Sequence, residues 1–181
     1  MSDVAYGIIG IIVGGILAYI IGPYISERFR LKTRLAESYL APFKEWCSNL
    51  YGELGEFNRR YLEKDYSHIS DLQIITDYRE LHETLRYAST WIGKIKGDIK
   101  ENLLKLMEIV DPFWHHLENE YSEELPSKEH VKLFENHLKG LSSIKRQEIA
   151  QRIREHLTDK KQDYSRCKIN AILDYLKRKI P

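Results

Sequence analysis

The chain has 181 residues, of which 43% are hydrophobic and 30% are charged, and its formal net charge at pH 7 is +1. This balance excludes a strongly basic or strongly acidic protein, and the 5 prolines and 10 glycines are too few for a mainly disordered chain. Cys47 and Cys167 are far apart and show no C-x-x-C spacing. They fit ordinary buried thiols in a reducing compartment.

Residues 4–25, VAYGIIGIIVGGILAYIIGPYI, contain no charged side chain. A helix of this length extends about 33 Å, enough for the roughly 30 Å hydrocarbon core of a bilayer. A signal peptide normally has a basic leader, which residues 1–3 lack, and a buried core helix normally has a polar face. The sequence therefore predicts one transmembrane helix that acts as a signal anchor.

The flanks of this segment predict its orientation. Tyr6 and Tyr24 would lie about 27 Å apart along a helix, near the two membrane interfaces. Four cations follow the segment: Arg28, Arg30, Lys32 and Arg34. Because positive flanks stay in the cytoplasm, we expect residues 1–3 outside the cell membrane and the rest of the chain in the cytoplasm, with the cations at the inner leaflet.

Small residues recur at every fourth position inside the predicted span, at Gly10, Gly14, Ala18 and Gly22. This spacing places them on one helix face, where a second helix can approach closely. Gly7 and Gly15 lie off this face and dilute the pattern. The pattern favours homo-oligomerisation through the span.

The segment after the span, residues 26–64, predicts a juxtamembrane helix that leads into a bundle formed with residues 65–181. Apolar residues from Phe29 to Tyr61 alternate at spacings of four and three, a coiled-coil-like heptad pattern. Pro42 would clash with the carbonyl of Ser38, so we expect a kink or a helix restart near Ala41.

Two further heptad-like patterns follow, over Ile74–Ile99 and Ile99–Leu117. Ser70 is a candidate N-cap for the first, and Asp98 with Glu101 has the form of a capping box for the second. The second pattern keeps its register across Pro112, which predicts one kinked helix there. It places Leu103, Leu106, Val110, Phe113 and Leu117 on the inward face.

The remaining chain predicts two or three shorter helices. One starts near Pro126, buries Phe134 and Leu138, and ends with Gly140 in the left-handed conformation. Ser142 or Ser143 can cap the next helix, whose inward face is Ile144, Ile149, Ile153 and Leu157, and Ile169 to Ile180 form the last apolar face. The predicted class is all-α, with five or six helices in the cytoplasmic bundle after the span.

Charge is unevenly distributed along the cytoplasmic part. Residues 101–136 contain nine acids and three lysines, a net charge of −6, whereas residues 141–181 contain eleven cations and five acids, a net charge of +6. The two segments could attract each other, or the basic segment could contact anionic lipid or nucleic acid. Nucleic acid is the least favoured partner, because acids are interleaved with the cations.

No motif for catalysis, cofactor binding or metal binding is present. HExxH, P-loop, GxGxxG, GxSxG and di-iron Glu-x-x-His patterns are all missing. His115 and His116 point about 100° apart on a helix, so only His116 with Glu120 could share a metal, and two ligands do not make a site. His130, His137 and His156 are interpreted as solvated or hydrogen-bonded residues.

The sequence thus predicts a single-pass membrane protein that acts by association, as a tether, a scaffold or an accessory subunit of an unidentified protein partner. Its other partners would be membrane lipid and further copies of the chain. The alternative is a membrane-tethered helical module that binds or cleaves nucleic acid. Arg152 and His156 have fewer residues between them than the Arg/His motif of helical HEPN ribonucleases, so that family is not assigned.

Overall fold

The computed structural model describes residues 25–34, 36–64, 66–125 and 131–180. Every regular element in these ranges is a helix and none is a strand, which confirms the all-α class. Residues 1–24 lie outside the described part of the chain. They include the predicted span except Ile25, the four small packing residues, Tyr6 and Tyr24. Among the helices that are described, none is both long enough and apolar enough to cross a membrane.

The chain divides into two units, residues 1–43 and residues 44–181. In the first unit, residues 25–34 are helical, a π-helix follows at Ala36–Leu40, and α2 (Ala41–Phe57) begins directly after it. Pro42 cannot donate a backbone hydrogen bond, and a widened turn removes the clash with the carbonyl four residues earlier. The interruption predicted near Ala41 is confirmed.

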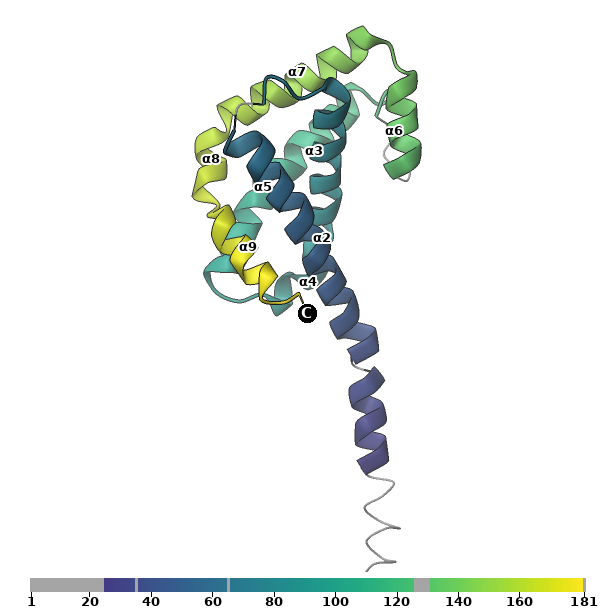
Figure 1. Cartoon of the computed structure of the whole chain (residues 1–181), viewed down its shortest axis with the longest axis vertical. Coiled ribbons are helices and arrows are strands. Elements are labelled where there is room, and N and C mark those ends of the chain that lie inside the picture. The colour runs from purple at the N-terminus through teal and green to yellow at the C-terminus, as the bar shows by residue number, and fades with distance from the viewer. Residues whose placement is uncertain (1–24, 35, 65, 126–130, 181) are drawn as a thin grey trace, which may run out of the picture. The chain divides into compact units, whose positions relative to one another are not determined.

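The second unit continues α2 and contains all the later elements (Figure 1). These are the π-helix Asn58–Leu62, α3 (Asp71–Arg86), α4 (Ala88–Trp91), the 3-10 helix Ile92–Lys94, α5 (Asp98–Glu120), α6 (Val131–Gly140), α7 (Ser143–Asp159), α8 (Lys161–Arg166) and α9 (Ile169–Lys177). The described part therefore has more helical segments than the five or six expected. The extra boundaries fall at Tyr87, Lys160 and Cys167, where polar or short connecting turns give little sequence signal.

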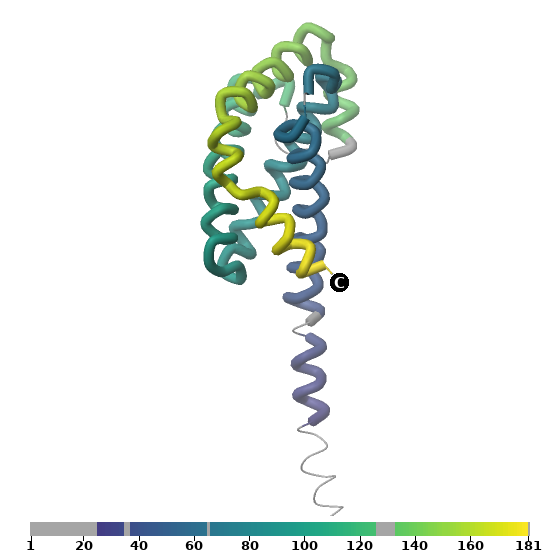
Figure 2. The backbone as a smooth tube through the Cα atoms, turned by 60° about the vertical axis from the view of Figure 1, so that its left-hand side comes forward, coloured from purple at the N-terminus to yellow at the C-terminus, as the bar shows by residue number. Residues whose placement is uncertain are grey.

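Helix α3 is the centre of the second unit. It packs against α5, α6 and α7, and α5 in turn packs against α8 and α9. In Figure 1, α7 leads from α6 back across the bundle to α8 and α9. Figure 2 shows α9 alongside α2, where a Cβ atom on Gly55 would lie 3.9 Å from Leu173.

The first heptad pattern is buried within the second unit. Cys47, Leu50, Leu54, Phe57 and Tyr61 are all at most 3% exposed. Burial of such side chains stabilises a fold by roughly 1.5–3 kcal/mol each. A hydrogen bond of 3.0 Å from the Trp46 indole to the carbonyl of Thr84 fixes α2 against α3.

Helix α3 begins as predicted. The Ser70 side chain accepts a hydrogen bond from the backbone N–H of Gln73 at 3.3 Å. The apolar residues of the pattern are buried, from Ile74 to Leu85. Arg79 is buried as well: its Nε lies 2.9 Å from Glu83 and its guanidinium lies 3.7 Å from the centre of the Phe134 ring on α6. A cation stacked on an aromatic face remains favourable when it is removed from water.

The prediction of a capping box at the start of α5 is wrong. Gly97 precedes the helix with φ of 65°, and Asp98 is already the first helical residue, with no side-chain cap. The helix continues through Pro112, as predicted, but Trp114 is buried where Phe113 was expected, and Phe113 is half-buried. The buried residues after Val110 are Trp114, four positions later, and Leu117, three positions after that. This spacing follows because a straight helix has 3.6 residues per turn, whereas a strict heptad repeat assumes 3.5.

Two further details of the last helices were predicted wrongly. Gly140 does not have the expected left-handed conformation, and Ile144 is 67% exposed. Ser142 caps α7 as expected, accepting a hydrogen bond from the N–H of Lys145, and Ile149, Ile153 and Leu157 are buried. Among the described non-glycine residues, only Lys168, directly before α9, has a left-handed backbone, with φ of 48°.

Candidate functional site

The helix at residues 25–34 displays both apolar and cationic side chains. Ile25 is 48% exposed, Phe29 66% and Leu31 54%. The four cations expected at the membrane interface are on the same helix and are exposed as well: Arg28, Arg30, Lys32 and Arg34. Exposed apolar side chains interleaved with long cationic ones are typical of helices at a membrane surface, where the cations reach the headgroups.

A second group of polar side chains lies between α3 and α5. His82 of α3 places Nε2 2.8 Å from Oδ1 of Asp111 on α5. One turn later on α5, His115 places Nε2 3.6 Å from the same oxygen. One ligand atom from each of these three residues lies within 4.8 Å of the other two, and they are the one such cluster of metal-ligand side chains in the described part of the chain.

The three members of this cluster differ in exposure. The side chain of His82 is 3% exposed, whereas those of Asp111 and His115 are about half exposed. Burial lowers the pKa of His82, and its hydrogen bond with Asp111 opposes that shift. The ring is packed against Trp114, with ring centres 5.9 Å apart, so it is held in one orientation.

Sequence reasoning missed this cluster because it considered the histidines of α5 only with their helical neighbours. His116 and Glu120 do form the expected pair, at 3.5 Å, but on the surface, and Arg152 also binds Glu120 at 2.9 Å. His82 is 29 residues from Asp111 and comes from another helix. Helix periodicity carries no information on which residues of two helices meet, so no signal in one sequence could have paired them.

His156 is part of an aromatic cluster rather than a ligand group. Its ring stacks on Phe113 with centres 3.7 Å apart, and its Nε2 lies 3.3 Å from the hydroxyl of Tyr164. That hydroxyl also lies 3.0 Å from the hydroxyl of Tyr78. Burial, aided by Lys160, lowers the pKa of His156 to about 4, so the ring is neutral at pH 7. Of the other histidines considered, His130 lies outside the described residues.

Two carboxyl groups meet between α2 and α3. Burial and the proximity of Glu53 and Asp77 raise the pKa of Glu80 to about 7, and burial also raises the pKa of Glu53. The nearby negative charges of Glu53 and Asp77 therefore favour the protonated form of Glu80.

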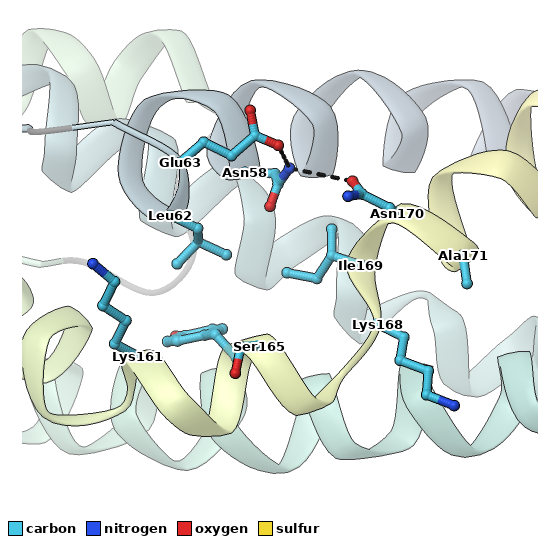
Figure 3. A pocket seen from close by; sticks show the side chains of 10 residues that line it. Asn58, Leu62, Glu63, Lys161, Ser165, Lys168, Ile169, Asn170 and Ala171 are labelled. Carbon is cyan, nitrogen blue, oxygen red and sulfur yellow. Dashed lines mark hydrogen bonds between the residues drawn. The ribbon is translucent and has the colours of Figure 1, made fainter.

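One described pocket contains few groups that converge. Its volume is about 330 Å³, and it lies between the π-helix Asn58–Leu62, α8 and the start of α9. Figure 3 shows Lys161 and Lys168 at opposite ends of it, pointing apart, while Leu62 and Ile169 form its apolar middle. Asn58 donates a hydrogen bond to Glu63 at 2.5 Å and a longer one to Asn170 at 3.5 Å. Two separated lysines do not form a bidentate anion site.

The two cysteines are poor nucleophiles. Both are buried, and neither is in a disulfide, as expected for ordinary thiols. Burial raises the pKa of each to about 11, which leaves almost no thiolate at neutral pH.

The acidic and basic segments contact each other within the second unit. Arg152 binds Glu120 at 2.9 Å, and Lys145 lies 3.7 Å from Glu124. Exposed pairs of this kind contribute at most about 1 kcal/mol each. They nevertheless show that part of the basic segment faces acidic side chains of the same chain.

No protein family, no curated protein and no solved structure matches the chain. Function is therefore inferred from the chain's own residues.

Proposed function

We propose that this chain is a single-pass membrane protein in which residues 4–25 anchor a helical bundle to the inner face of the cell membrane. It acts by association, as a tether, a scaffold or an accessory subunit, and has no catalytic role of its own. The observation that carries the proposal is the exposed helix at 25–34, which follows an uncharged segment of the length of a membrane span.

The helix at 25–34 supports the orientation as well as the location. Phe29 and Leu31 would lie in the headgroup region, and the cations would face anionic inner-leaflet lipid at about 1 kcal/mol each. Exposure of the two apolar side chains costs free energy in water and much less in the headgroup region.

Association is favoured because three groups that could have supplied catalysis are not arranged for it. The thiols are protonated, His156 is stacked among aromatic rings, and the lysines of the pocket do not converge. The small residues Gly10, Gly14, Ala18 and Gly22 would form the contact between two spans.

Membrane topology is tested with single reporter cysteines in intact cells. Ser2→Cys should react with a membrane-impermeant maleimide, whereas Gln162→Cys, at an exposed position of α8, should react only after the cells are permeabilised. The unmodified chain is the control for Cys47 and Cys167, which are buried. Labelling of Gln162→Cys in unbroken cells, or release of the chain by alkaline carbonate, would refute the proposal.

Self-association is tested in a membrane two-hybrid reporter. Gly14→Leu should lower the signal several-fold, because a leucine keeps the helix backbones apart. Gly15→Leu is the matched control, since it makes the same change one residue away, off the proposed face. Equal signals from the two variants would reject the proposed contact.

A further inference from the structure

The cluster of His82, Asp111 and His115 has the donor atoms of a transition-metal site. It combines two imidazole nitrogens and one carboxylate oxygen. Such a set suits zinc and its first-row neighbours, whereas magnesium and calcium prefer oxygen ligands alone. We propose that this cluster binds one divalent transition-metal ion of the zinc type and thereby links α3 to α5.

The distances in the cluster are close to those a bound ion requires. Tetrahedral zinc with bonds of about 2.0–2.1 Å holds its ligand atoms about 3.3 Å apart. His115 Nε2 and Asp111 Oδ1 are 3.6 Å apart, and His82 Nε2 and the same oxygen are 2.8 Å apart. Binding would thus change each of these two distances by about half an ångström, and it would bring the two histidine ligand atoms, which lie within 4.8 Å of each other, to about the same separation by side-chain rotation.

Glu118 already orients His115 for metal binding. Its Oε2 lies 3.2 Å from Nδ1 of His115. Because an ionised carboxylate only accepts hydrogen bonds, Nδ1 carries the proton and donates a hydrogen bond to Glu118. The lone pair is then on Nε2, the nitrogen that faces Asp111 and His82. A carboxylate that holds the second nitrogen of a histidine is the usual outer partner of a metal-bound imidazole.

His82 supplies the buried ligand of the proposed site, through Nε2. Its side chain is nine-tenths buried, and its Nδ1 has no hydrogen-bond partner among the described residues. A metal on Nε2 would replace the hydrogen bond that this nitrogen now makes with Asp111, at 2.8 Å. The imidazole need lose no net proton, because its proton can move from Nε2 to Nδ1 when the metal takes Nε2.

The fourth coordination position would face water, since the side chains of Asp111 and His115 are about half exposed. A closed structural zinc site has four protein ligands, so this three-ligand site would also hold a water molecule. All three ligands lie in the second unit, so metal binding does not depend on the membrane anchor.

The test is zinc binding by the full-length, tag-free chain in a non-ionic detergent, with ZnCl₂ titrated by isothermal calorimetry. One equivalent should bind, and Co²⁺ in its place should give a visible ligand-field absorption. Glu118→Gln should raise the Kd about 10–100-fold, the range for loss of an outer partner. His115→Ala and Asp111→Asn, which change half-exposed side chains, should raise it further while the circular dichroism stays unchanged.

His116→Ala is the matched control. It removes the adjacent histidine of the same helix, which is exposed, pairs with Glu120 and takes no part in the cluster. Zinc affinity should be unaltered in this variant. No binding by the unmodified chain, or equal weakening by His115→Ala and His116→Ala, would overturn the proposal.

Discussion

The helix at residues 25–34 and helix α2 carry parts of one heptad pattern, yet their apolar side chains have opposite environments. Phe29 in the helix at 25–34 is 66% exposed, and Leu40 in the π-helix that follows is 55% exposed, whereas Leu50 and Leu54 in α2 are fully buried. An apolar repeat therefore specifies a face but not what covers that face. The flanking residues are more informative: four cations surround the exposed part, and aromatic and aliphatic residues surround the buried part.

The largest effect that separates the two regions is a loss of core packing. Leu54→Ala should lower the free energy of unfolding by about 2–5 kcal/mol, because it leaves a cavity in a fully buried position. Leu40→Ala, the same change at an exposed position, should change it by less than about 0.5 kcal/mol. Urea unfolding of the full-length chain in detergent, followed by circular dichroism, measures both. Similar losses would mean that Leu40 is covered too.

A smaller effect concerns pH and arises only in the buried region. The pKa of His156 is about 4 in the folded chain and about 6.5 in the unfolded chain. The unfolded chain binds the extra proton, so stability is complete above about pH 6.5 and falls as the pH drops toward 4. The shift corresponds to about 3 kcal/mol, which partial exposure reduces to about 1–2 kcal/mol.

His156→Phe keeps the stacking on Phe113 and removes the titration. Stability of this variant should depend less on pH between 4 and 6.5, as measured by the unfolding midpoint at each pH. A pH profile identical to that of the unmodified chain would show that other groups cause the acid sensitivity.

The smallest effect runs in the opposite direction. The pKa of Glu80 is about 7 in the folded chain and about 4.5 in the unfolded chain, so the folded chain holds the extra proton. This contribution is complete below about pH 4.5 and is lost as the pH rises through 7. Glu80→Gln should therefore stabilise the protein at pH 8, by about 1 kcal/mol after allowance for its partly exposed position.

Glu45→Gln is the control for this prediction, because Glu45 lies on the exposed side of α2. It should leave the unfolding midpoint at pH 8 unchanged. A loss of stability in Glu80→Gln would show that the ionised carboxylate makes a favourable contact.

Much of the fold follows from local signals. The burial of Leu50, Leu54, Ile74 and Leu106 was predictable from periodicity, and the caps at Ser70 and Ser142 from residue type. These features depend on residues within one or two turns. Continuity through Pro112 was predictable for the same reason.

The errors occur where distant residues or backbone conformation decide the outcome. A glycine with positive φ, Gly97, starts α5 in place of the expected aspartate cap, and Trp114 rather than Phe113 enters the core. The contact of His82 with Asp111 depends on how α3 packs against α5. A single sequence contains the periodicity of each helix but not the pairing between them.

The left-handed residue before α9 has a practical consequence. Lys168 holds a conformation that costs a side-chain-bearing residue roughly 1–2 kcal/mol and costs glycine almost nothing. Its side chain extends away from the rest of the pocket (Figure 3). Glycine at this position is therefore a starting point for engineering a more heat-resistant variant without altering any helix.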